Sequence, residues 1–116
     1  TRFVASADVV VLPYDSREQV TSGVLTEAVA AGKPVISTSF PHAVELLSGG
    51  VGLLVPQGDH RSIAQALTSV LTDADLTAHM AGRARSLTSG LLWSTVASRY
   101  VDLGRSLVRP HLRAAV

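Results

Sequence analysis

The chain has 116 residues, of which 47% are apolar and 16% charged, with a formal net charge of +1 and no cysteine. This length suits one small domain with an apolar core, and the low charge gives no basic surface for nucleic acid or an anionic membrane. The absence of cysteine excludes disulfides, cysteine-ligated zinc and thiol catalysis.

Three short apolar runs predict buried strands. Residues 9–12 form a β-branched run that Pro13 stops, and similar runs follow at 34–37 and 52–55. Helical patterns separate the runs, which is typical of βαβ units in a parallel sheet. We therefore expect an α/β fold with three parallel strands that lie side by side in sequence order.

The helices between and after these strands have recognisable ends. Residues 23–31 predict a helix with Ser22 as its N-cap and Gly32 as the residue that follows its C-terminus. A short helix is expected at 43–47. Asp59 lies in a turn and is placed to cap the next helix.

The C-terminal part of the chain predicts helices only. Apolar residues at 63–71 recur with helical spacing, and further helices are expected at 75–87 and 92–108. Trp93 is predicted to anchor the last helix in the core. Residues 109–116 show no pattern and are expected to form a tail.

A ligand site is expected where the three strands end. In open parallel sheets, ligands bind beyond the carboxyl ends of the strands, beside helix N-termini. The helix that begins at Gly23 follows the long loop at 13–21, and its free amides and dipole suit a phosphate. Glu27 lies one turn further along, where a carboxylate can accept hydrogen bonds from two neighbouring hydroxyls. Each feature alone is common, because many helices begin with Ser-Gly and carry a glutamate, so Glu27 could also be an ordinary exposed helix residue.

Three sequence blocks with preserved spacing resemble a known family. Residues 7–13, 25–36 and 52–59 are similar to the donor-binding region of GT-B glycosyltransferases, and the similarity extends over 5–100. Within that group the chain looks like the retaining family four, the glycosyl transferases group 1. Together the blocks are specific, although none of them is specific alone.

The resemblance implies a fold and an activity. Residues 1–108 would form a Rossmann-like part of the C-terminal nucleotide-sugar-binding domain of a two-domain enzyme, and 109–116 a tail. Such an enzyme transfers a sugar from a nucleoside diphosphate with retention, without a metal or other cofactor, because positive side chains and helix dipoles offset the diphosphate charge. No protein nucleophile is expected in this chain.

The resemblance also assigns individual residues. The family pairs two glutamates separated by seven residues, and the second matches Glu27, which would bind the ribose of the nucleotide. The first falls on Gln19, where an amide can bind a sugar hydroxyl but supplies no charge. Because the stretch from Gln19 resembles a variant motif of some bacterial members, altered recognition is favoured over lost activity. Thr21, Ser22 and Gly23 would then face the donor sugar and its phosphates.

Two further residues have open roles. His42 follows the second strand and could reach the nucleotide, although a polar loop residue is the commoner case. Glu45 matches a glutamate that is frequent in the family, and it could either contact the ligand or support the loop. The other histidines share no metal-ligand spacing, so no metal site is expected.

Two alternatives remain to the transferase interpretation. Gln19 is compatible with a catalytically silent binding or assembly module of GT-B type, and a nucleotide-sugar epimerase has the same fold. A dinucleotide-binding dehydrogenase is disfavoured because no glycine-rich fingerprint follows a strand.

The chain is expected to be a segment of a longer protein. It begins without Met or a signal-peptide pattern, and the resemblance leaves out an N-terminal acceptor domain and half of the donor domain. We therefore expect it to be inactive alone and to self-associate through the exposed edge of the strand at 9–12. The expected partners are the nucleotide-sugar donor and the N-terminal domain, not nucleic acid. The expected location is the cytoplasm, including the inner face of the membrane.

Overall fold

The computed structural model describes residues 2–114. Its elements are α1 (Arg2–Ala5), β1 (Val10–Leu12), α2 (Gly23–Ala30), β2 (Val35–Thr38), α3 (Pro41–Leu47), β3 (Gly52–Val55), α4 (His60–Thr72), α5 (Ala74–Leu91) and α6 (Trp93–Ala114). The predicted strands and the predicted helices before residue 92 are confirmed to within four residues, and the last predicted helix extends six residues further than expected. Helix α1 was not predicted, because four residues are too few to show a helical period.

The three strands form one parallel sheet in the order β1-β2-β3, as the sequence predicts. Strand β2 is central, and its four residues are all buried. Strand β1 lies at an edge of this sheet. The fold is therefore α/β, and the carboxyl ends of the three strands meet at one edge.

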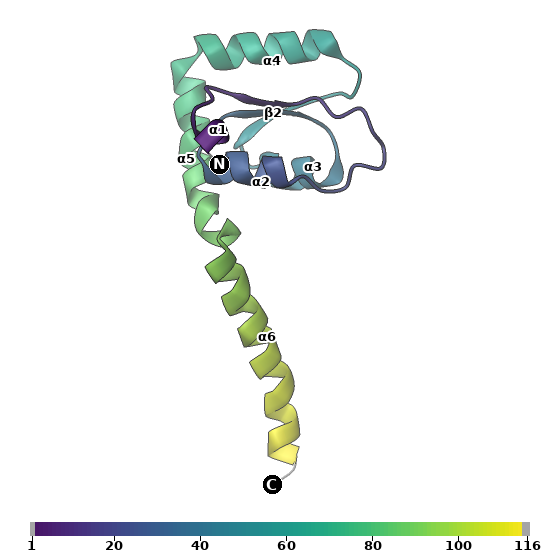
Figure 1. Cartoon of the computed structure of the whole chain (residues 1–116), viewed down its shortest axis with the longest axis vertical. Helices are drawn as coiled ribbons and strands as arrows, with labels where there is room; N and C mark the ends of the chain where they lie inside the picture. Colours follow the sequence, from purple (N-terminus) through teal and green to yellow (C-terminus); the bar gives the residue numbers. More distant parts are fainter. Residues whose placement is uncertain (1, 115–116) are drawn as a thin grey trace.

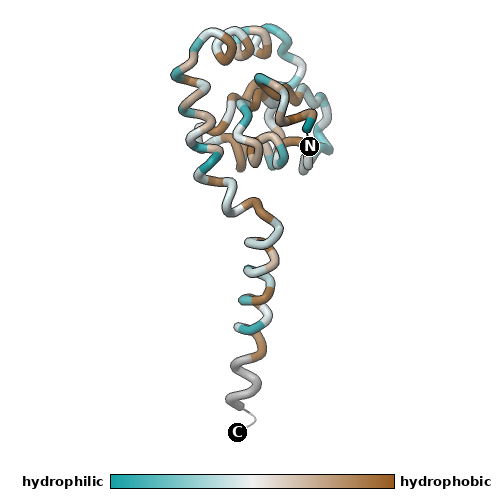
Figure 2. The backbone as a smooth tube through the Cα atoms, turned by 60° about the vertical axis from the view of Figure 1, so that its left-hand side comes forward, coloured by the Kyte–Doolittle hydropathy of each residue, from teal (hydrophilic) through white to brown (hydrophobic). Residues whose placement is uncertain are grey.

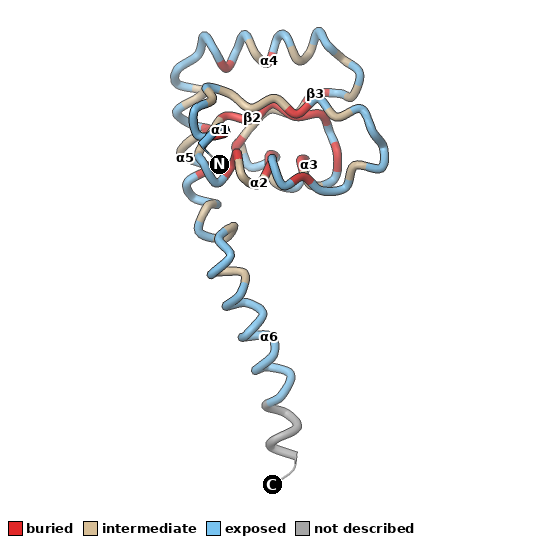
Figure 3. Tube along the Cα trace, viewed as in Figure 1, coloured by how far each residue is buried: buried red, intermediate tan, exposed pale blue. Residues whose placement is uncertain are grey.

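Helices cover both faces of the sheet. Figure 1 shows α4 over one face and α2 and α3 over the other, while α5 runs past one side and contacts both α2 and α4. Successive residues of β2 point to opposite faces, so Val35 packs in the cluster with α2 and α3, and Ile36 in the cluster with α4. Buried residues concentrate in the strands and on the helix sides that face them (Figure 3).

The predicted helix ends are confirmed. The Ser22 side chain accepts a hydrogen bond from the third amide of α2, and the Asp59 side chain does the same for α4. Gly32, with φ of 69°, adopts the left-handed conformation after α2. The amides of Gly32 and of the next residue donate back into the last turn, which is a Schellman motif.

Helix α6 projects away from the sheet (Figure 1) and gives the chain extents of 65 × 29 × 24 Å. Apolar residues recur along it (Figure 2), but the side chain of Trp93 is 87% exposed, so its prediction as a core anchor is wrong. An apolar stripe predicts a face that can be buried, but it does not say what buries that face. The helix also includes residues 109–114, which were expected to be a tail, whereas 115–116 lie outside the described residues. Within the described part of the chain, no helix is long and apolar enough to cross a bilayer.

Gly52 lets β3 approach β2 closely. A Cβ atom at this position would lie 2.4 Å from the carbonyl oxygen of Val35 and 3.0 Å from Cδ2 of Leu47. The first neighbour is backbone of the central strand and cannot move aside cheaply.

We expect Gly52→Ala to lower the free energy of unfolding by about 1–3 kcal/mol, because overpacking forces backbone shifts. Gly49→Ala is the matched control, since a Cβ there meets no atom within 4 Å. Urea denaturation of both variants measures the difference. Equal stability of the two variants would contradict the close approach.

Candidate functional site

The three loops at the carboxyl edge of the sheet are tied together by Gln57. Its Nε2 donates to the carbonyl oxygen of Ser16 at 3.3 Å and to that of Ser39 at 3.0 Å. These carbonyls belong to the loops after β1 and β2, and Gln57 follows β3. Hydrogen bonds therefore link all three loops at the edge of the sheet where the sequence predicted a ligand site.

Thr38 fixes the point at which the long first loop leaves β1. The Thr38 side chain is 2% exposed, and its hydroxyl donates to the carbonyl of Tyr14 at 2.7 Å, with the Leu12 carbonyl at 3.4 Å. The Tyr14 ring packs edge-on against Phe40, with 5.3 Å between ring centroids. A buried hydroxyl needs a partner, so this contact holds the start of the loop against β2.

The start of α2 is open at Gly23. The position that a Gly23 Cβ would take has no atom within 4 Å. The preceding Ser22 is buried, and its Oγ caps the helix while lying 3.1 Å from the Tyr14 hydroxyl. A helix end with exposed backbone beside a fixed cap suits an anion.

His42 connects this helix end to α3. Its Nδ1 accepts a hydrogen bond from the backbone N–H of Ser22 at 3.2 Å, and its own backbone N–H donates to the carbonyl of Val20 at 3.2 Å. His42 therefore contacts the loop that precedes α2. The sequence placed it near the site but gave no indication of these contacts.

The Gln19 side chain folds back onto its own loop. Its Nε2 donates to the carbonyl of Thr21. A carboxylate could not make this contact, because an ionised glutamate has no hydrogen to donate. The amide at position 19 is thus matched to the observed loop conformation.

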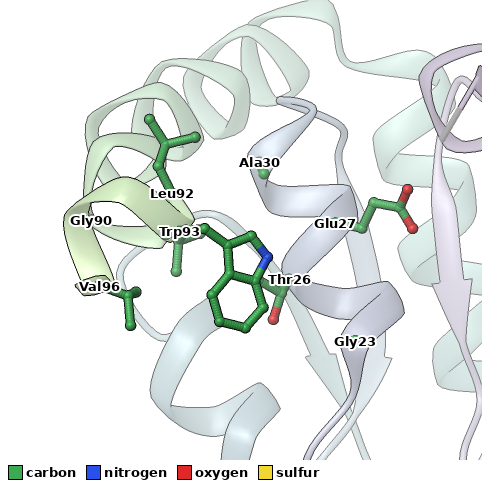
Figure 4. Close-up of a pocket in the computed structure, with 9 residues that line it drawn as sticks. Gly23, Thr26, Glu27, Ala30, Gly90, Leu92, Trp93 and Val96 are labelled. Carbon is green, nitrogen blue, oxygen red and sulfur yellow. The ribbon is translucent and has the colours of Figure 1, made fainter. Parts of the chain in front are cut away.

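Glu27 and Gly23 lie on one face of α2, as their spacing predicts. Both line a cavity of about 660 Å³ between α2 and the junction of α5 and α6. The complete lining comprises Gly23, Thr26, Glu27, Ala30, Gly90, Leu91, Leu92, Trp93 and Val96. In Figure 4 the Trp93 ring stands over this cavity, whereas the Glu27 carboxylate points away from the ring, toward the other flank of α2.

The structure thus brings together most of the predicted site residues, which are Gln19, Thr21, Ser22, Gly23, Glu27 and His42. Glu45 is exposed on α3, and its carboxylate makes no hydrogen bond or ion pair with the described residues. Sequence reasoning missed Tyr14, Thr38 and Gln57. Two polar residues, Ser37 and Thr38, end the buried strand β2, and this was the available indication for Thr38.

Asp59 adds a negative charge to the third loop. The backbone N–H of Ser62 donates to its carboxylate at 3.0 Å and the Ser62 hydroxyl at 2.7 Å, and these bonds lower the pKa of Asp59. Asp59 is therefore a charged cap and not a proton donor near neutral pH. Among the side chains that the structure describes, residues 2–108, no group of three or more His, Asp and Glu could hold a metal ion.

Comparisons with known proteins find one family and several relatives. Residues 1–73 match the family described as glycosyl transferases group 1. A phosphatidyl-myo-inositol mannosyltransferase of Mycobacterium leprae is 36% identical over 77 residues, which cover 66% of this chain and 21% of that protein. A D-inositol 3-phosphate glycosyltransferase of Corynebacterium urealyticum is 35% identical over 103 residues, which cover 88% of this chain and 24% of that protein.

Solved structures agree with this match. Sucrose-phosphate synthase of Thermosynechococcus elongatus superposes with a TM-score of 0.75 at 27% identity, over 93% of this chain and 27% of its own. Anabaena HepE superposes with TM-scores of 0.76 in complex with UDP-glucose and 0.77 in complex with UDP, at 25% and 26% identity, over 93% of this chain and 29% of its own. The chain therefore spans less than a third of each of these relatives.

The lowered pKa of Asp59 predicts a pH-dependent contribution to stability. A carboxylate whose pKa is lower in the folded state stabilises the fold fully above its unfolded pKa. This contribution is lost as the pH falls through the folded pKa. We therefore expect the stability difference between the wild type and Asp59→Asn, which keeps a capping oxygen but cannot ionise, to shrink on acidification.

Urea denaturation at a series of pH values from neutral to acid measures this difference. Ser62→Ala removes the hydroxyl but keeps the backbone donor, so it should reduce the pH dependence without abolishing it. A difference that does not change with pH would show that the Asp59 carboxylate gains nothing from its contacts.

Proposed function

The chain belongs to the glycosyl transferases group 1 family, and from this we propose that it is the donor-binding part of an enzyme that transfers a sugar from a nucleoside-diphosphate sugar with retention of configuration. The family match supports a GT-B-type domain. The proposal includes the retention of configuration, the assignment to family four and the donor-binding role. The main support is the open N-terminus of α2 with Glu27 one turn beyond it.

In this proposal the diphosphate binds at the start of α2. Its charge interacts with the exposed backbone at Gly23 and with the helix dipole, so no metal or other cofactor is required. The ribose binds to the Glu27 carboxylate, and the donor sugar lies against Gln19 and Thr21. Since HepE was solved with UDP and UDP-glucose, a nucleotide sugar is the donor that the relatives favour.

The reaction itself needs little chemistry from this chain. With retention on one face of the sugar, the leaving phosphate accepts the proton of the acceptor hydroxyl, and no protein nucleophile takes part. Donors aimed at the developing phosphate charge then supply the stabilisation. In this scheme neither His42 nor Glu45 exchanges a proton with the substrates.

A partner domain is required for activity. Exposed apolar residues recur along α6 beyond the Trp93 cavity, and they support docking of an N-terminal acceptor domain. The free edge of β1 supports pairing with a further strand, either of the same polypeptide or of a second copy. We propose that this chain alone is inactive, and that the complete enzyme works in the cytoplasm or at the inner face of the membrane.

A catalytically silent binding module is the second candidate. Gln19 favours it, because an amide cannot supply charge to an oxocarbenium-like transition state. Normal donor hydrolysis by the full-length protein would exclude this candidate.

Removal of the Glu27 carboxylate should weaken nucleotide binding. Hydrogen bonds to a charged group contribute about 1.5–3 kcal/mol, so we expect Glu27→Ala to raise the Kd about tenfold or more. A two-dimensional NMR titration with UDP, GDP and ADP measures this change and identifies the base. Asp102→Ala removes an exposed carboxylate on α6 and is the control for net charge. An unchanged Kd in Glu27→Ala would contradict the ribose site.

Gly23→Ala separates binding from folding in the same titration. The added Cβ meets no protein atom, so the variant should be as stable as the wild type or more stable by about 0.4–1 kcal/mol. We expect it to bind UDP more weakly, because the methyl group occupies the space through which a phosphate approaches the backbone. Unchanged UDP binding would remove Gly23 from the site.

Gln19→Glu tests the amide. A carboxylate would face the Thr21 carbonyl without a hydrogen to share, so we expect weaker UDP binding by about threefold to tenfold, the size of one hydrogen bond. Gln19→Met, of similar length and without charge, separates the lost hydrogen bond from the added charge. Tighter binding in Gln19→Glu would show that this loop accepts the common family residue.

A further inference from the structure

His42 makes two hydrogen bonds with the loop before α2, one as a donor and one as an acceptor. Its backbone N–H donates to the Val20 carbonyl, and its side-chain Nδ1 accepts from the Ser22 backbone N–H, each at 3.2 Å. The two loop residues lie about twenty positions earlier in the chain. His42 is half-buried and follows Pro41, the first residue of α3, whose fixed φ starts that helix. The loop is thus held to the N-terminus of α3 by two hydrogen bonds.

These contacts decide which amides remain for a ligand. The N–H of Ser22 donates to His42, that of Leu25 to the Ser22 hydroxyl, and that of Thr26 to the Ser22 carbonyl. Among the described residues, the backbone N–H groups of Gly23 and Val24 have no acceptor. Two adjacent free donors beside a glycine form a defined anion-binding position.

We propose that His42 is a positioning residue of the donor site, whose unprotonated Nδ1 holds Ser22 so that the Gly23 and Val24 amides face the diphosphate. This inference rests on the proposed function. His42 acts through Ser22 and does not need to touch the donor. It replaces the expectation that His42 reaches the nucleotide itself.

The contact requires one state of the imidazole. A ring nitrogen accepts a hydrogen bond only when it carries no proton, so neutral His42 must bear its hydrogen on Nε2. Protonation turns Nδ1 into a donor that opposes the Ser22 N–H. We call the hydrogen bond between Nδ1 of His42 and the N–H of Ser22 the clamp. The clamp therefore opens when the imidazole becomes charged, and the orientation of the free amides is lost with it.

The segments next to α3 and α3 itself carry other titratable groups. They are Tyr14, Asp15, Arg17 and Glu18 on the first loop, Glu27 on α2, Glu45 on α3 and Asp59 on the third loop. A comparison of variants at position 42 holds this set constant. Any difference in pH dependence between such variants then comes from His42.

His42→Asn and His42→Ala form the test pair. The Asn Oδ1 can take the place of Nδ1 as an acceptor but does not titrate, whereas Ala removes the acceptor. Far-ultraviolet circular dichroism and urea denaturation confirm that both variants fold. Nitrogen NMR of the ring gives the tautomer, and the Ser22 amide shift reports the clamp without ligand.

UDP titrations between pH 8 and pH 5 give the functional readout. We expect the wild type to carry the Nε2–H tautomer and to lose affinity on acidification. His42→Asn should keep near-wild-type affinity at pH 8 and show only the pH dependence of UDP itself. His42→Ala should bind about threefold to tenfold more weakly at pH 8.

Two results would overturn the inference. One is an Nδ1–H tautomer in the wild type, and the other is the same pH dependence in the wild type and in His42→Asn. An absence of UDP binding at any pH would overturn the proposed function instead. In that case the tautomer and the Ser22 shift, both measured without ligand, would still decide whether the clamp exists.

Discussion

The parallel pairing of β1 and β3 on either side of β2 is the constraint on which the rest of the structure depends. It brings loops that are far apart in sequence to one edge of the sheet, where Gln57 bonds to both of the other loops. The central strand is buried along its whole length, so Thr38 must find its partner within the protein. The need to satisfy that hydroxyl places Tyr14, and Tyr14 in turn contacts the cap of α2.

Most polar side chains described at this edge form hydrogen bonds with backbone groups of the protein itself. Of the buried side-chain nitrogens and oxygens in the described residues, none lacks a hydrogen-bond partner. Among the described residues, the backbone N–H groups of Gly23 and Val24 at this edge remain without an acceptor. In the proposed donor site, the oriented peptide groups at the start of α2 would contribute positive potential toward an anion.

The strands and most helices could be predicted because their determinants are local. The signals used were apolar runs and the helix-end residues Ser22, Asp59 and Gly32. Each of them determines the structure of residues only a few positions away. The contacts of His42 and Thr38 could not be predicted, since each joins residues more than fifteen positions apart and depends on the finished sheet. The prediction that Trp93 lies in the core was wrong for a related reason. The apolar pattern is a property of the helix alone and does not say which surface packs against that helix. Glu27 was identified from its spacing after Gly23 and again through the resemblance, and Gln19 through the resemblance alone. The roles assigned to both are still predictions.

Helix α6 has a consequence for how the protein unfolds. It meets the remainder of the chain chiefly through α5, and the apolar side chains described along it are largely exposed. A denaturant transition therefore combines two events of different cooperativity. One is the unfolding of the sheet and its packed helices, and the other is the fraying of a helix with little tertiary support. Circular dichroism at 222 nm would weigh the long helix heavily, whereas an amide in β2 would report the sheet alone. The two probes need not give the same midpoint, and only the second refers to the part of the chain that holds the candidate site.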